Sequence, residues 1–221
     1  MNWSAAILAG GQARRLGGQD KSALLVDGVR FIDRQIAALR PLTDRIVLVG
    51  YRGSGPAPLP VEIDRWPGTG ALGALGTALS VAQTDRVLVL ACDLPFVTTE
   101  FLAFLAAVDR AATAVIPVWH GQWQPLCAMY ARRAASPIAA AIARGDRGVI
   151  ATVEQLGPRL VGGDELMPFD RAERLLANIN TLEELARFGH PQTPPGAATS
   201  LDDVNAGDRT AASEASQTTR R

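Results

Sequence analysis

Residues 8–24, LAGGQARRLGGQDKSAL, follow an apolar run and hold four glycines, two arginines and a lysine. Glycine permits positive φ and the close approach of another group, so this composition is typical of a loop that wraps a ligand. The basic side chains indicate that the ligand is an anion. The alternative is an ordinary turn whose basic residues are solvated.

Short apolar runs recur along the chain, and helical patterns separate them. We expect strands at residues 4–8, 45–49, 86–91, 113–118 and 126–130. Several of these runs are apolar throughout, which is typical of strands covered on both faces in a parallel sheet. Helical patterns lie at residues 32–39, 72–82 and 98–108, and beyond Tyr130 the pattern is mostly helical. The alternation predicts an α/β three-layer sandwich with a mostly parallel sheet.

The composition divides the chain near residue 190. With 221 residues, of which 48% are hydrophobic and 20% charged, the chain suits one globular domain with a substantial core. Residues 190–221 are rich in Pro, Ser, Thr, Ala and charge and hold no aromatic residue. Such a segment buries too little apolar surface to offset its ordering entropy. We expect a domain over residues 1–189 and a flexible, disordered tail over residues 190–221.

Charge and cysteine content argue against several classes of protein. Lys plus Arg equals Asp plus Glu, so no overall field attracts nucleic acid or an acidic membrane, and any anion site must be local. No apolar run approaches membrane-spanning length, and the first residues lack the basic start of a signal peptide. Cys92 and Cys127 lie in apolar segments without metal-type spacing, which is typical of buried thiols in a reducing compartment. We expect a cytoplasmic protein that binds neither nucleic acid nor membranes.

The glycine-rich loop departs from two familiar phosphate-binding motifs. The P-loop requires a glycine directly before Lys21, where Asp20 stands, and G-x-G-x-x-G has no match after Leu8. The loop instead fits L-A-G-G-x-x-x-R-x-G-G-x-D-K. This long pattern resembles the signature of the MobA-like nucleotidyltransferases, the family of the molybdenum cofactor guanylyltransferases.

The resemblance implies roles for the loop residues that agree with their chemistry. Successive backbone N–H groups of a glycine loop form an anion nest, and an arginine fork with a lysine charge suits a triphosphate. The catalytic residues implied in the loop are Arg15 and Lys21. The nucleotide-binding residues implied there are Leu8, Ala9, Gly10, Gly11 and Lys21.

Asp93 follows an apolar strand and precedes Pro95, so its carboxylate should lie at the carboxyl end of that strand, beside the glycine loop. Magnesium in nucleotide sites is usually held by one or two carboxylates together with phosphates and waters. The resemblance makes Asp93 the metal ligand and a catalytic, nucleotide-binding residue. The alternative is an aspartate that forms a turn or caps the following helix, for which Thr98 or Thr99 is the better candidate.

Two further segments match the family. The segment IDRWPGTGALGAL, residues 63–75, resembles D-x-x-P-G-x-G-P-L, with Ala71 where proline is usual, and the resemblance implies that Asp64 and Gly70 bind the nucleotide. In NINTLEEL, residues 178–185, Asn180 matches an asparagine beside the metal, and an amide oxygen suits magnesium. The alternatives are a glycine-rich loop packed on its helix and a turn asparagine before a helix.

The resemblance covers about residues 4–188 and implies a Rossmann-like nucleotidyltransferase fold. It further implies Mg²⁺-dependent transfer of GMP from GTP to molybdopterin (molybdenum) cofactor, with release of pyrophosphate. A phosphate oxygen of the pterin attacks the α-phosphorus in line, so no covalent enzyme intermediate is needed and Cys92 has no catalytic part. Val49 stands where some relatives carry an asparagine that helps to bind the base.

Three alternatives to this function remain open. A cytidylyltransferase for the same cofactor, or a sugar-phosphate nucleotidyltransferase, would share the loop, the aspartate and the fold. A nucleotide-binding sensor without turnover is the third, although Lys21 and Asp93 together favour an enzyme. Expected partners are GTP, the molybdopterin cofactor, and a protein that delivers the cofactor or a molybdoenzyme chaperone that receives it.

Overall fold

The computed structural model describes residues 2–10, 24–53, 56–169, 174–179, 184 and 187. The strands of its main sheet are β1 (Trp3–Leu8), β4 (Ile46–Val49), β5 (Val61–Glu62), β6 (Arg86–Ala91), β7 (Ala114–Trp119), β8 (Gln122–Trp123), β9 (Cys127–Ala131) and β10 (Arg159–Gly162). A separate small hairpin consists of β2 (Leu25–Val26) and β3 (Val29–Arg30).

The α-helices are α1 (Phe31–Leu39), α2 (Ala71–Val81), α3 (Thr99–Ala107), α4 (Ala135–Ala143) and α5 (Val149–Glu154). Short 3-10 turns lie at Arg132–Ala134 and Gly163–Glu165. Among the helices in the described ranges, none combines the length and the apolar character that crossing a bilayer requires.

The main sheet is mostly parallel, as predicted. Its strand order is β10-β7-β9-β6-β1-β4-β5, and β8 pairs with β7. Neighbours are parallel except around β9, which runs antiparallel to both β6 and β7, and at the β7–β8 pair. All five strands expected from the sequence are present, but the expectation of a mostly helical region beyond Tyr130 missed β10. That strand is four residues long and only Val161 in it is buried, so its apolar signal is weak.

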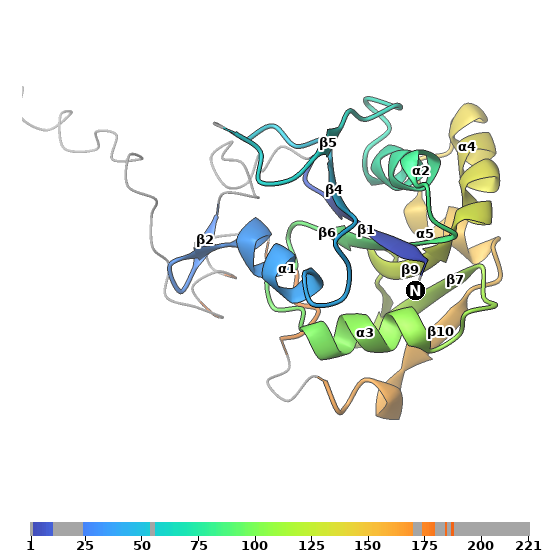
Figure 1. The fold of residues 1–221 in the computed structure, drawn as a ribbon. Coiled ribbons are helices and arrows are strands. Elements are labelled where there is room, and N and C mark those ends of the chain that lie inside the picture. Colours follow the sequence, from blue (N-terminus) through green and yellow to red (C-terminus); the bar gives the residue numbers. More distant parts are fainter. Residues whose placement is uncertain are drawn as a thin grey trace, which may run out of the picture.

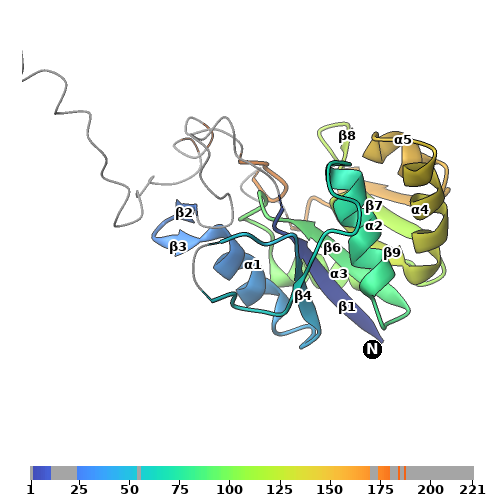
Figure 2. The same cartoon turned by 90° about the horizontal axis from the view of Figure 1, so that it is seen from above.

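Helices cover both faces of the sheet, with α2 and α4 on one side and α1 and α3 on the other (Figures 1 and 2). Side chains of β6 alternate between the two cores: Leu88 and Leu90 pack with α1 and α3, whereas Val87 and Val89 pack with α2, α4 and α5. Since both faces are buried, every position of the strand after Arg86 is apolar, and the expected three-layer sandwich is confirmed.

The helix after β6 starts as the sequence predicts. Thr98 is the N-cap of α3, and its side chain accepts a hydrogen bond from Phe101 N at 3.3 Å. The neighbouring Thr99 donates from Oγ1 to Ala38 O at 2.9 Å, which links α3 to α1. Because Thr98 fills the capping position, Asp93 is not needed for that purpose.

Candidate active site

Three parallel strands end level with one another and define one edge of the sheet, which we call the site edge. Leu8, the last residue of β1, pairs with Val49 of β4 on one side and with Ala91 of β6 on the other. Whatever follows these strands therefore meets at the same place. This is where open α/β sheets bind their ligands.

Two glycines bring the backbones after β1 and β4 into direct contact at the site edge. Ala9 N donates to Val49 O at 2.9 Å, and a Cβ on Gly10 would lie only 3.3 Å from Gly50 O. Gly50 also has a φ of 69°, which side chains rarely adopt. The close approach thus depends on glycine at both positions, although the sequence directed attention to Gly10 alone.

The structure places part of the predicted phosphate loop. Leu8 and Ala9 are buried and Gly10 is exposed, so Leu8 and Ala9 can offer a nucleotide little more than backbone groups. Gly11, Arg15 and Lys21 lie outside the described residues.

Asp93 lies in the turn directly after β6, at the site edge. The turn is attached on two sides by its backbone: Cys92 N donates to Leu8 O at 3.2 Å, and Ile179 N donates to Asp93 O at 2.9 Å. The second bond brings the segment 174–179 against Asp93, as a joint metal site with a nearby asparagine would require. Asn180 itself lies outside the described residues.

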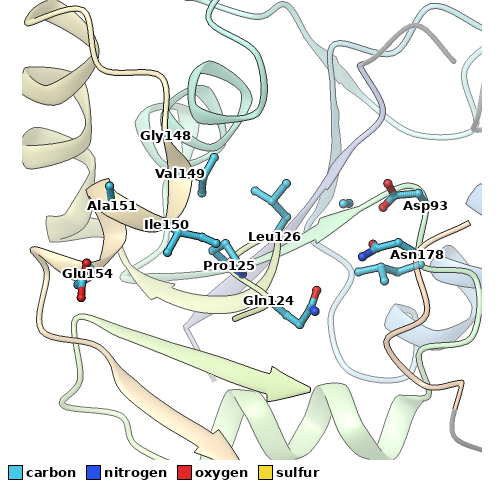
Figure 3. Close-up of a pocket in the computed structure, with 12 residues that line it drawn as sticks. Asp93, Gln124, Pro125, Leu126, Gly148, Val149, Ile150, Ala151, Glu154 and Asn178 are labelled. Atoms are coloured by element: carbon cyan, nitrogen blue, oxygen red, sulfur yellow. The ribbon is translucent and has the colours of Figure 1, made fainter. Parts of the chain in front are cut away.

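A cavity of about 710 Å³ opens beside Asp93. Its polar side chains are those of Asp93, Gln124, Glu154 and Asn178, and most of the remaining lining is apolar and comes from the segment before β9 and from α5. The side chains of Asp93 and Asn178 lie at the same end of the cavity (Figure 3). The sequence did not single out Gln124 or Asn178 as site residues, because an isolated polar residue next to a strand carries no pattern.

The donors beside the cavity fit a magnesium ion that is shared with phosphates. The Asp93 carboxylate is a hard oxygen ligand of the kind that Mg²⁺ prefers, as the amide oxygen of an asparagine would be. Within the described ranges, no three or more His, Cys, Asp or Glu residues gather into a possible metal cage.

Asp64 anchors the loop that precedes α2. Its Oδ1 accepts hydrogen bonds from Trp66 N and from Thr77 Oγ1, both at 3.0 Å. Thr77 is fully buried in α2 and also accepts from Arg65 N at 3.0 Å. One carboxylate oxygen of Asp64 is thus occupied in holding the loop, a structural role that the sequence did not indicate.

Gly70 ends this loop and is the N-cap of α2. Its φ of 67° and ψ of −145° belong to a region that is nearly exclusive to glycine. Among the described residues other than its chain neighbours, a Cβ there would meet no atom within 4 Å, so the backbone conformation and not crowding requires the glycine. The exposed loop leaves room for a ligand beside the first turn of α2.

Two side chains discussed from the sequence are unavailable to a ligand. Val49 is fully buried in the core beneath α2, so any base contact at the end of β4 must come from backbone groups. Cys92 and Cys127 are buried and form no disulfide, as expected. Burial raises the pKa of Cys127 far above its ordinary range, so this thiol remains protonated and unreactive.

By its fold, the chain is a Rossmann-like α/β sandwich of the kind that nucleotidyltransferases of known structure share. A 2-C-methyl-D-erythritol 4-phosphate cytidylyltransferase from Thermus thermophilus shares this fold, with a TM-score of 0.63, 18% identity and coverage of 85% of this chain and 96% of that one. Molybdopterin-guanine dinucleotide biosynthesis protein A from Archaeoglobus fulgidus is more similar, with a TM-score of 0.72, 28% identity and coverage of 83% and 95%.

Comparison of amino-acid sequences assigns the chain to one family within this class of proteins. The family model described as MobA-like NTP transferase domain matches residues 5–159, and the chain belongs to this family. A probable molybdenum cofactor guanylyltransferase from Chloroflexus aggregans is 34% identical, over 84% of this chain and 92% of its own length. A molybdenum cofactor guanylyltransferase from Vibrio cholerae is 31% identical, over 84% and 91%. The expected family and fold are confirmed.

Proposed function

We propose that this chain transfers GMP from GTP to molybdopterin (molybdenum) cofactor, which forms the guanine dinucleotide cofactor and releases pyrophosphate. The observation that carries the proposal is the position of Asp93, where the ends of β1 and β6, the segment 174–179 and the 710 Å³ cavity meet. The names of the relatives from Chloroflexus aggregans and Vibrio cholerae support the choice of substrates.

The nucleotide is proposed to bind on the side of Asp93 formed by β1, β4 and the start of α2. The contact between Gly10 and Gly50 leaves backbone exposed at the strand ends, and the loop held by Asp64 faces the same edge. In the proposed site, Gly70 lies beside the nucleotide and Gly11 continues the phosphate nest. Because Val49 is buried, backbone groups read the base.

The cofactor is proposed to occupy the cavity on the other side of Asp93. Its volume of about 710 Å³ is ample for a small organic ligand, since such sites typically span about 300–1,000 Å³. A pterin is flat and apolar on its faces, with hydrogen-bonding groups at its rim. The apolar lining suits its faces, and the amides of Gln124 and Asn178 suit its rim.

The proposed reaction is one in-line displacement. A terminal phosphate oxygen of the cofactor forms a bond to the α-phosphorus of GTP, the bond to the oxygen that bridges to the β-phosphate breaks, and pyrophosphate leaves with the electron pair. Bound Mg²⁺ would neutralise charge on the phosphates. Asp93 and Asn180 are its proposed protein ligands, and Arg15 and Lys21 the proposed cations on the triphosphate.

The test is pyrophosphate release from each of the four common NTPs, with and without molybdopterin. We expect release only with molybdopterin present, and kcat/KM for GTP roughly tenfold or more above that for CTP, because the loop carries Gly11 where a methyl group would crowd a purine. Equal use of CTP would indicate a cytidylyltransferase, turnover with a sugar phosphate would indicate the second alternative, and binding without turnover would indicate a sensor.

The setting of the reaction is proposed as the cytoplasm, where buried thiols such as Cys92 and Cys127 stay reduced. The cofactor is proposed to pass directly between this chain and a protein that delivers or receives it. Cell fractionation and affinity capture of the tagged full chain test these two statements separately.

A further inference from the structure

Gln35 is a fully buried polar side chain of α1 that reaches the turn carrying Asp93 from the α1 and α3 face of the sheet. Its Nε2 donates to Ala91 O at 2.7 Å and to Leu94 O at 3.1 Å. These two carbonyls lie on either side of Asp93 in the sequence. One amide nitrogen therefore bridges the two ends of the turn.

The two hydrogen bonds made by Gln35 Nε2 suit an amide side chain. A primary amide offers two N–H donors at a single atom, and here both find backbone acceptors. Among the described residues, Gln35 Oε1 has no hydrogen-bond partner. A flipped amide would direct this oxygen at two carbonyl oxygens, so the two donated bonds fix its orientation.

Packing alone does not explain a glutamine at this position. Its neighbours on the same side of α1, Ile32 and Leu39, are apolar and contribute to the core against the sheet. An aliphatic residue would fill the same space without the cost of burying an amide. The amide adds two hydrogen bonds to the backbone of the turn at residues 91–94.

We propose that Gln35 is a positioning residue for nucleotidyl transfer, which keeps the Asp93 carboxylate at the site edge by holding both ends of its turn. The backbone bonds from Cys92 N to Leu8 O and from Ile179 N to Asp93 O hold the same turn from other directions. The inference rests on the proposed function, because it assigns the metal to Asp93.

Three variants separate positioning from stability. Gln35→Met keeps the length of the side chain and removes both donors, and Asp93→Ala removes the carboxylate. Thr84→Val is the matched control: Thr84 is buried, its Oγ1 donates to Arg86 O at 2.9 Å, and it lies before the opposite end of β6. Each variant is made in the full chain, and its melting temperature is measured first.

Two further measurements report on the site. One is Mn²⁺ binding in the presence of GTP, followed by electron paramagnetic resonance, which needs no turnover. The other is kcat and KM for GTP with molybdopterin as acceptor. For Gln35→Met we expect Mn²⁺ affinity and kcat each to fall roughly tenfold or more, as for other residues that orient a metal ligand, with KM for GTP unchanged. Thr84→Val should lower the melting temperature while both site measurements stay at wild-type values.

Wild-type Mn²⁺ affinity and kcat in Gln35→Met would overturn the inference, and so would equal losses in Thr84→Val. If Gln35→Met does not fold, Gln35→Asn provides the test, because it keeps the donors on a stem too short to reach both carbonyls. Reduced metal affinity in folded Gln35→Asn supports the inference, and unchanged affinity overturns it. A wild type without transfer activity, or undiminished metal binding in Asp93→Ala, would refute the proposed function instead.

Discussion

Two aspartates near the site edge, Asp64 and Asp93, differ in the contacts that they make. Asp64 uses Oδ1 to hold Trp66 N and the buried Thr77. Asp93 follows a strand end, lines the cavity, and has its turn held by the backbone of neighbouring segments. The first aspartate therefore shapes a loop, and the second is proposed to bind the metal.

Asp93→Ala should abolish nucleotidyl transfer and leave the fold intact. The carboxylate is the proposed metal ligand, whereas the bond from Ile179 N is made to the backbone of Asp93 and survives the substitution. Pyrophosphate release and thermal melting of the variant check the two halves of this prediction. Full activity at ordinary Mg²⁺ concentration would contradict the assignment.

Thr77→Val should loosen the loop before α2. The substitution removes a hydroxyl that bonds both Asp64 Oδ1 and Arg65 N in a buried place, which should cost about 1–3 kcal/mol of unfolding free energy. KM for GTP should rise more than kcat falls. Urea denaturation and steady-state kinetics measure both effects, with Thr77→Ser as the control that keeps the hydroxyl. Equal behaviour of the two variants would show that the hydroxyl is unimportant.

Among the elements, β9 combines two buried ionisable groups on one strand. Cys127 and Tyr130 are both fully buried, and burial raises the pKa of each far above its ordinary range. The Tyr130 hydroxyl also donates to Pro125 O at 2.7 Å. The folded chain therefore keeps both groups protonated at pH values where an unfolded chain releases these protons.

Stability should consequently fall in alkaline solution. The stabilisation from these two protonated groups is complete below the pKa values that cysteine and tyrosine have in an unfolded chain, about 8.5 and 10. It is lost as the pH rises above these values. Urea denaturation between pH 7 and the alkaline limit of the buffer should show this decline. Cys127→Ala should reduce its slope from about pH 8.5 upward, and a slope that the substitution leaves unchanged would contradict the prediction.

The elements that could be predicted from the sequence are those with a repeating apolar pattern. Burial of both faces made residues 5–8 of β1 and residues 87–91 of β6 continuous apolar runs. The helix α2 could be predicted because it is composed almost entirely of small and apolar residues, most of them buried. The short strands β5 and β8 and the half-exposed β10 have no such pattern. Their existence depends on neighbours that lie far away in the sequence.

The site was predictable only where a motif spans consecutive positions. Asp93 and Gly10 were found in this way, and the structure places both at the site edge. Gln35 was missed because its partners lie 56 and 59 residues further along the chain. Thr77 was missed for a similar reason, since the hydroxyl inside an apolar helix gains its meaning only when the loop carrying Asp64 folds back on it.

For the whole molecule, the described core lies within residues 2–179. Residues 190–221, outside the described residues, hold few large apolar side chains. We propose that they lie outside the domain. Deletion of residues 190–221 should leave the melting temperature and kcat nearly unchanged, because such a segment has little to pack.

Calorimetry and the pyrophosphate assay check this prediction. Truncation after Ala177 is the contrasting variant, because it also removes Asn178 from the cavity and the Ile179 N–H from Asp93 O, and it should lose activity. A drop of several degrees on removal of residues 190–221 alone would show that the segment docks on the domain.

The reversed direction of β9 has a consequence for how such proteins diversify. Because β9 runs against β6 and β7, it begins at the edge where β1, β4 and β6 end, and the segment Gln124–Leu126 enters the cavity there. The site edge thus holds both outgoing loops, which follow the strands β1, β4 and β6, and an incoming loop, which precedes β9. The outgoing loops after β1 and β4 are proposed to serve the nucleotide and the incoming loop the acceptor, with Asp93, in the loop after β6, between the two substrates. In this arrangement, a change in the loop before β9 can alter the acceptor while the loops after β1 and β4 continue to bind the same nucleotide donor.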